Sequence, residues 1–224
     1  MIDKMTSLSY YVPMTGGWNG SRRPLLSTTC SHGQCTCMRQ DIYNQISRIN
    51  DHLYLCALQA LSPARLRQLG VTQVISVMPE PIPGGLVSQV ERHVQIPVDD
   101  IDFANLRAHF DNVGERIARE AQIGGRTAVH CMAGVSRSAT MVLAYLIKYQ
   151  NMSLHAAYEH VRSVRPCIQP NIGFWRQLIA YEEACSGSRS MRITPDGFID
   201  VASAPRRTYW PNSVNNHRPR FRKH

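Results

Sequence analysis

An apolar segment that runs directly into Cys131, followed by a loop of small residues and a second apolar segment, restricts the fold of this chain more than any other feature. The first segment is RTAVHC (126–131), the loop is MAGVS (132–136), and the second segment is RSATMVLAYLIKYQ (137–150). The first has the pattern of a buried strand and the second that of a helix. A strand, a tight loop and a helix in this order are typical of α/β folds.

The same alternation of strands and helices extends over residues 43–185. Strands are expected in the β-rich segment 44–57 and at 71–78, 92–98 and 126–131, and helices at 62–70, 103–125, 137–150, 153–164 and 171–184. The expected helix at 103–125 has one apolar stripe, made of Phe103, Leu106, Phe110, Val113, Ile117 and Ala121. PEPIPGG (79–85) is too rich in proline and glycine for a strand. The sequence therefore predicts one α/β domain with a central, mostly parallel sheet flanked by helices.

The two ends of the chain have a different composition. Residues 1–42 are expected to be poorly ordered, 43–185 to form the domain, and 186–224 to form a basic tail in which 191–201 packs on the domain as an extended arm. The tail has eight Arg and Lys against Asp196 and Asp200, a balance of +6 out of the net charge of +9 of the whole chain. Charge that is concentrated in a tail does not by itself indicate a nucleic-acid partner, and none is expected.

The cysteines and the apolar segments bear on the cellular compartment of the protein. The chain has 7 cysteines, an odd number, and no apolar segment near the start that would serve as a secretory signal. Reduced thiols in the cytoplasm are therefore expected, with the nucleus as a second compartment and the mitochondrion disfavoured. No transmembrane segment is expected, because the run at 139–147 is far shorter than the roughly 20 residues of a membrane span. CSHGQCTC (30–37) does not have the spacing of a zinc site, so no metal is expected.

Topology predicts that Cys131 lies near an acidic cluster. One long helix is expected to join the strands at 92–98 and 126–131, so these strands run parallel and end at the same edge of the sheet. Open α/β sheets bind ligands at that edge. Asp99 and Asp100 follow the first strand, and Cys131 ends the second.

The loop between Cys131 and Arg137 is suited to binding a phosphate group. Backbone N–H groups of a loop that enters a helix point to a common centre, at the positive end of the helix dipole. This environment also favours a cysteine thiolate, and a guanidinium can hold two phosphoryl oxygens at once. We expect Cys131 to attack phosphorus, Arg137 to bind the phosphate, an aspartate to protonate the leaving group and Ser138 to donate to the departing sulfur. The phosphate-binding residues would be Met132, Ala133, Gly134, Val135, Ser136 and Arg137, while His130 orients the loop.

These motifs resemble those of a known family. HCMAGVSRS matches the His-Cys-x5-Arg-Ser signature of the cysteine-dependent protein phosphatases, and the run from 129 to 178 is similar to that of the small atypical dual-specificity phosphatases, including the block RP…PN.GFW.QL. The resemblance covers about residues 43–185. It implies a protein-tyrosine-phosphatase-like fold and metal-independent hydrolysis of phosphotyrosine and phosphoserine or phosphothreonine, without a cofactor. Phosphorylated proteins, with signalling kinases among the candidates, would be the partners.

Several alternatives remain open at this level. The family pattern places the general acid at Asp100, while a shift along the loop would favour Asp99 or Asp102. Asn171 suits either a hydrogen bond to the catalytic loops or the N-cap of the following helix. An RNA 5′-triphosphatase, a phosphoinositide phosphatase and a non-catalytic phosphate-binding scaffold are alternative functions on the same fold. The absence of charged residues at 132–136 favours singly phosphorylated substrates.

Overall fold

The computed structural model describes residues 42–88 and 90–202. The cysteine cluster at 30–37 and the end of the basic tail, 203–224, lie outside the described residues. Within the described part, no helix is both long enough and apolar enough to cross a lipid bilayer.

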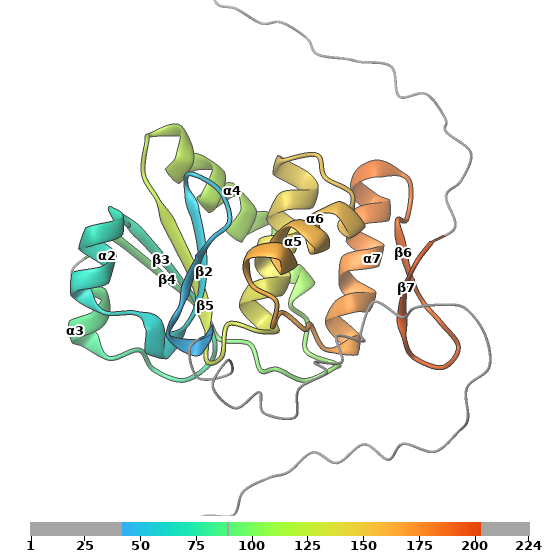
Figure 1. The fold of residues 1–224 in the computed structure, drawn as a ribbon, viewed down its shortest axis with the longest axis horizontal. Coiled ribbons are helices and arrows are strands. Elements are labelled where there is room, and N and C mark those ends of the chain that lie inside the picture. The colour runs from blue at the N-terminus through green and yellow to red at the C-terminus, as the bar shows by residue number, and fades with distance from the viewer. Residues whose placement is uncertain (1–41, 89, 203–224) are drawn as a thin grey trace, which may run out of the picture.

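A five-stranded sheet forms the centre of the molecule, as Figure 1 shows. Its order is β1-β2-β5-β3-β4, with β1 antiparallel to β2 and all other neighbours parallel. The strands are β1 (Ile46–Arg48), β2 (Leu53–Ala57), β3 (Gln73–Val77), β4 (Arg92–Ile96) and β5 (Thr127–Cys131). The predicted mostly parallel sheet is therefore confirmed.

The strands predicted at 92–98 and 126–131 are not neighbours in the sheet. The two strands are parallel, but β3 lies between them and pairs with both. In addition, β4 ends at Ile96 rather than at residue 98. Pro97 has no N–H group to donate to the ladder, so the chain leaves the sheet there and the loop carrying Asp100 begins earlier.

Helices cover both faces of the sheet, and each face has its own hydrophobic core. Figure 1 shows two short helices, α2 (Pro63–Leu69) and α3 (Gly84–Val87), on one side, and the longer helices on the other. These are α4 (Phe110–Gln122), α5 (Arg137–Tyr149), α6 (Leu154–Val164) and α7 (Ile172–Ser186). Successive side chains of β2 point to opposite faces of the sheet. Tyr54 and Cys56 therefore belong to the smaller core beside α2, while Leu53 and Leu55 belong to the larger core. Two 3₁₀ turns, η1 (Leu58–Ala60) and η2 (Arg107–His109), lie in the connections.

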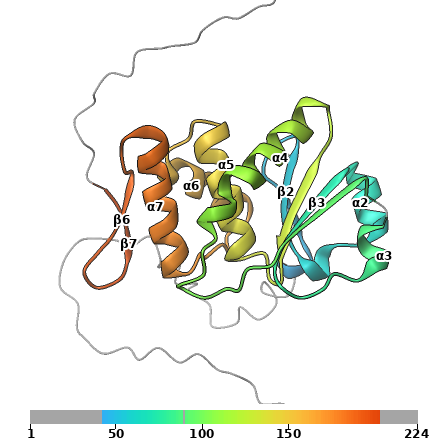
Figure 2. The ribbon, with the colours of Figure 1, turned by 180° about the vertical axis from the view of Figure 1, so that it is seen from behind.

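Helix α5 leads from the Cys131 loop into the middle of the larger core. Each of its residues from Arg137 to Ile147 is buried. A helix that is apolar on nearly all sides must be surrounded by other elements, and both ribbon views show α5 between the sheet and the outer helices (Figures 1 and 2). The start of α5, and with it the loop before it, is therefore held on several sides.

Helix α4 is shorter than the predicted helix at 103–125. It begins at Phe110, after the 3₁₀ turn η2. Leu106 and Phe110 are buried as expected, but Phe103 is 87% exposed and does not belong to the apolar stripe. Asn105 Oδ1 accepts a hydrogen bond from Ala108 N–H, which starts the turn at this point. Residues 103–106 instead continue the loop that carries Asp100.

A small β-hairpin follows α7. Its strands β6 (Met191–Ile193) and β7 (Ile199–Val201) are antiparallel, and Met191 is fully buried in the larger core. Figure 2 shows the hairpin beside α7, on the side of that helix away from the sheet. This is the segment 191–201 that was expected to pack as an extended arm.

Candidate active site

Cys131 is the last residue of β5 and lies at the floor of the loop 132–136. It is only 1% exposed, so a small, deeply penetrating group is needed to reach its sulfur. Sγ accepts a hydrogen bond from Gly134 N–H at 3.2 Å and another from Ser138 Oγ at 3.1 Å. Donors directed at the sulfur stabilise negative charge on it.

Four carbonyl groups of the loop, those of residues 132–135, accept hydrogen bonds from other parts of the chain. The Met132 carbonyl accepts from Leu58 N–H at 3.3 Å, and the Val135 carbonyl accepts from Gln169 N–H at 2.9 Å. The carbonyls between them, at residues 133 and 134, accept from the Arg165 side chain at 3.1 and 2.7 Å. In a trans peptide the N–H group points opposite to the C=O group. The N–H groups of residues 133–136 are therefore turned toward the inside of the loop, where they form a cradle for an anion.

Arg165 supports this loop through hydrogen bonds to its backbone carbonyl groups. It is 1% exposed and is a C-terminal capping residue of α6. Nε donates to the Gly134 carbonyl, Nη2 to the Ala133 carbonyl, and Nη1 to the carbonyls of Ile42 and Gln45. The planar fork of an arginine is suited to several acceptors at fixed angles. Arg165 begins the block RP…PN.GFW.QL that carries the family resemblance. Its role was not predicted from the sequence, because its acceptors lie in segments far from it along the chain.

Gly134 allows the loop to pack against the end of β2. Its φ is +67°, a conformation that glycine adopts without steric cost. A Cβ atom at this position would lie 2.4 Å from the carbonyl oxygen of Cys56. Both the backbone conformation and the close approach therefore require glycine here.

Arg137, the first residue of α5, joins the loop to the chain after β4. Its side chain is buried, and Nη1 donates to the Val98 carbonyl at 3.3 Å. Nε forms an ion pair with Asp100 Oδ2 at 3.6 Å, which is too far for a hydrogen bond, and it is buried with no hydrogen-bond partner among the described residues. Buried donors are normally paired, so this N–H group is available to an oxygen of a bound ligand.

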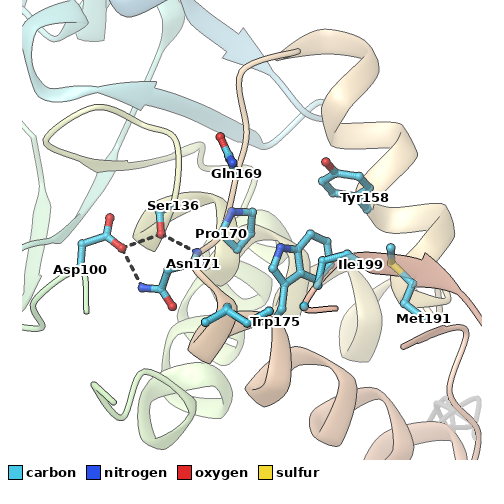
Figure 3. Close-up of a pocket in the computed structure, with 11 residues that line it drawn as sticks. Asp100, Ser136, Tyr158, Gln169, Pro170, Asn171, Trp175, Met191 and Ile199 are labelled. Atoms are coloured by element: carbon cyan, nitrogen blue, oxygen red, sulfur yellow. Dashed lines mark hydrogen bonds between the residues drawn. The ribbon is translucent and has the colours of Figure 1, made fainter. Parts of the chain in front are cut away.

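Of the three carboxylates left open by the sequence, Asp100 is the one that contacts the loop. Asp100 Oδ1 accepts hydrogen bonds from Ser136 Oγ at 2.7 Å and from Asn171 Nδ2 at 2.9 Å, while its side chain stays 33% exposed. All three residues are exposed at the surface, but the side-chain contacts with Ser136 and Asn171 belong to Asp100. Figure 3 shows the Asp100 carboxylate facing Ser136 and Asn171.

Asn171 makes both interactions that were considered as alternatives. Its Oδ1 accepts from Phe174 N–H as the N-cap of α7, while its Nδ2 donates to Asp100. Gly173, two residues further, brings the Asp100 loop close to this helix: a Cβ atom there would lie 1.7 Å from the Asp102 carbonyl oxygen. The N-terminus of α7 thus positions the carboxylate.

A chain of hydrogen bonds behind the loop fixes His130. Ser76 Oγ lies 2.6 Å from His130 Nε2 and 2.9 Å from His93 Nε2, and His130 Nδ1 lies 3.4 Å from the Cys131 carbonyl. Burial lowers the pKa of His130 to about 4, so the ring is neutral at pH 7. Nδ1 must carry the proton to donate to a carbonyl, so Nε2 accepts from Ser76, which in turn accepts from His93. The geometry agrees with an orienting role for His130.

Comparison with known proteins agrees with this geometry. The family described as "Dual specificity phosphatase, catalytic domain" matches residues 53–184. The chain belongs to the dual specificity phosphatase family. Dual specificity protein phosphatase 14 of Mus musculus is 43% identical over 157 residues, which is 69% of this chain and 78% of that protein. For dual specificity protein phosphatase 18 of Mus musculus the identity is 40% over 149 residues, 66% and 78% of the two chains.

Solved structures place this phosphatase among the atypical members. The crystal structure of human DUSP28 matches with a TM-score of 0.59 and 34% identity, over 62% of this chain and 93% of that one. The crystal structure of DUSP15 matches with a TM-score of 0.59 and 30% identity, over 63% and 89%. The predicted fold and the predicted class of enzyme, a protein phosphatase, are confirmed.

Proposed function

We propose that this phosphatase hydrolyses phosphotyrosine and phosphoserine or phosphothreonine esters in proteins through a phosphocysteine intermediate. The observation that carries the proposal is the set of N–H groups of residues 133–136 turned into the loop above the Cys131 sulfur. These donors converge where the equatorial oxygens of a phosphoryl group would lie during attack by Sγ. The Nε of Arg137, which has no hydrogen-bond partner among the described residues, adds a charged donor on the side of Asp100.

In the first step, the Cys131 thiolate attacks phosphorus, the P–O bond to the substrate breaks, and Asp100 in its acid form gives its proton to the leaving oxygen. Asp100 Oδ1 is engaged by Ser136 and Asn171, so Oδ2 is the oxygen left to carry that proton.

In the second step, Asp100 takes a proton from a water molecule, which attacks the thiophosphate. The P–S bond breaks and inorganic phosphate leaves, while Cys131 returns to the thiolate. The Ser138 hydroxyl, 3.1 Å from Sγ, donates to the sulfur as negative charge returns to it. The side chains of Cys131, Asp100, Arg137 and Ser138, together with the backbone N–H groups of the loop, thereby supply the nucleophile, the acid and base, and the donors that the cycle requires.

A leaving-group series tests these roles. Cys131→Ser should abolish release of phosphate from aryl phosphates and prevent the covalent ³²P-labelling of the protein that rapid denaturation traps in wild type. Asp100→Asn should lower kcat by about 10²- to 10⁴-fold for a poor leaving group such as an alkyl phosphate, and much less for nitrophenol, which leaves without a proton. The matched control is Asp99→Asn, which should behave as wild type. Turnover by Cys131→Ser would contradict the mechanism.

Phosphopeptides and alternative substrates test the specificity. Phosphotyrosine and phosphothreonine peptides should both be hydrolysed, with a larger kcat/KM than triphosphate RNA or phosphoinositides. The reason is that the loop positions Met132, Ala133, Val135 and Ser136 provide no positive charge for additional phosphates. Faster turnover of triphosphate RNA would overturn this part of the proposal.

A further inference from the structure

A cavity of about 610 Å³ opens beside Asp100 and extends away from the cysteine, between α6, α7 and the β6–β7 hairpin. Asp100 and Ser136 form its near end. Its other lining side chains come from three separate parts of the chain, namely α6, the residues from 169 to the start of α7, and the hairpin. Figure 3 shows this row of side chains running from Asp100 past Pro170 and Trp175 to Met191 and Ile199.

The walls of this cavity are mainly apolar. The apolar members are Tyr158, Pro170, Ile172, Trp175, Met191 and Ile199. Tyr158 and Trp175 are packed edge to face with ring centroids 5.0 Å apart, and both are buried, so this part of the wall is fixed in place. Among the described residues that line the cavity, Asp100 is the only acidic residue, and no lysine or arginine is present.

This composition selects the kind of group that the cavity can take. A second phosphate or an acidic side chain would need a basic partner, which the lining does not offer. An apolar side chain would gain free energy by leaving water for these walls. Because the cavity starts at the catalytic carboxylate, a group that occupies it must lie within a few residues of the phosphorylated one.

We propose that this cavity is a specificity pocket for an apolar side chain of the substrate, close in sequence to the phosphorylated residue. The inference rests on the proposed function and extends it from the phosphoryl group to the sequence around it. The hairpin residue Ile199 then has a role in substrate selection, although β7 lies far from Cys131 in the sequence. Free aryl phosphates do not reach this pocket and are not affected by it.

The proposal is tested by measuring kcat/KM for sets of phosphopeptides that share one phosphorylated residue and differ at a single neighbouring position. Each position flanking the phosphoresidue is occupied in turn by Ala, Leu, Glu or Lys. Wild type should show, at one position, a kcat/KM about 10- to 100-fold larger for Leu than for Glu, as expected for burial of one apolar side chain. Ile199→Lys should remove this preference and raise kcat/KM for Glu at the same position, while turnover of nitrophenyl phosphate stays at the wild-type value.

The matched control is Phe198→Lys, which adds the same charge to the hairpin at an exposed side chain outside the cavity lining. It should keep the wild-type preference. Partial unfolding cannot raise kcat/KM for Glu peptides. An increase in the Ile199 variant therefore reports on the pocket and not on a loss of stability.

Each other outcome rejects the inference in a distinct way. Equal turnover of all flanking residues by wild type, with nitrophenyl phosphate still hydrolysed, would overturn the pocket alone. Equal shifts in the Ile199 and Phe198 variants would assign the effect to general charge. If a chain ending at residue 202 acquired an apolar preference that the full chain lacks, residues 203–224 would be the occupant instead. No turnover of nitrophenyl phosphate by wild type would overturn the proposed function, and this inference with it.

Discussion

At the scale of single residues, the site depends on places where backbones approach closer than a side chain allows. Gly173 is such a place, because the loop that carries Asp100 crosses the first turn of α7 with the Asp102 carbonyl directly over the glycine. Nearby, Asn171 N–H lies 3.3 Å from Ser136 Oγ, and its side chain holds Asp100. The distance between the acid and the sulfur is thus set partly by a residue that takes no part in the chemistry.

We predict that Gly173→Ala impairs proton donation selectively. The added methyl group must displace the Asp102 backbone, and with it the Asp100 carboxylate. We expect kcat for alkyl phosphates to fall at least about 10-fold, since a small displacement of an acid removes much of its benefit. Nitrophenyl phosphate should be affected far less. Gly85→Ala, where a Cβ atom meets nothing within 4 Å, is the control. Equal loss on both substrates would show that the loop is not displaced selectively.

At the scale of elements, the phosphate-binding loop is fixed by the end of α6 as much as by β5 and α5. Arg165 links α6, the loop and the segment around Gln45, and it is buried without a carboxylate partner among its hydrogen bonds in the described chain. Carbonyl oxygens carry partial negative charge and several of them can replace a carboxylate as the partner of a guanidinium. The loop conformation is therefore coupled to the packing of α6.

We predict that Arg165→Met destabilises the protein and weakens binding of phosphate analogues. The carbonyls of Ala133 and Gly134 would lose their donors, which costs about 1–3 kcal/mol for each buried group. Urea denaturation should show a loss of roughly 2–6 kcal/mol for the two carbonyl groups, and the inhibition constant for vanadate should rise.

Arg165→Lys should recover little, because an ammonium group cannot reach the same acceptors. Arg176→Met, at an exposed position of α7, should remain like wild type in both measurements. Wild-type vanadate inhibition in Arg165→Met would show that the loop keeps its shape without this arginine.

At the scale of the whole molecule, the buried polar chain Ser76–His130 crosses the central strands β3 and β5 and connects the site to overall stability. His130 is fully buried, and burial holds its pKa at about 4, below its ordinary value of 6.5. Burial also lowers the pKa of His93, at the other end of the chain of hydrogen bonds. Below pH 6.5, the unfolded chain therefore binds protons that the folded protein does not.

We predict that the free energy of unfolding falls as the pH drops from 6.5 to 4. Since only the unfolded state takes up the proton at His130 in this range, the slope approaches about 1.4 kcal/mol per pH unit and the total loss is roughly 3 kcal/mol. Urea denaturation of wild type and His130→Asn across this range measures it, and the variant should lose stability less steeply. Parallel curves for the two proteins would rule out His130 as the source.

The sequence alone was sufficient for the parts of the site that are local. Residues 126–150 form a strand, a loop and a helix as predicted, because the apolar pattern and the small residues act within a few positions of each other. The helices expected at 62–70, 153–164 and 171–184 also start where they were predicted, with Ser62, Ser153 and Asn171 as N-caps. An N-cap can be predicted because its side chain bonds to a backbone N–H only three residues further along the chain. The predicted helix at 103–125 was wrong at Phe103 because the apolar spacing continues through this residue. In the structure, the segment before α4 forms a loop that packs against α7.

Tertiary structure alone decided which distant groups surround that loop. The family pattern favoured Asp100 but kept its neighbours Asp99 and Asp102 as alternatives, whereas contacts with Ser136 and Asn171 distinguish Asp100 in the structure. The support from Arg165 and the apolar cavity lined by Ile199 likewise depend on packing between segments far apart in the chain. Such contacts are determined by how whole layers fit together, so no short stretch of residues encodes them. A strand, a loop and a helix specify where a phosphate can bind, and the arrangement of the remaining elements specifies the acid and the substrate that meet it there.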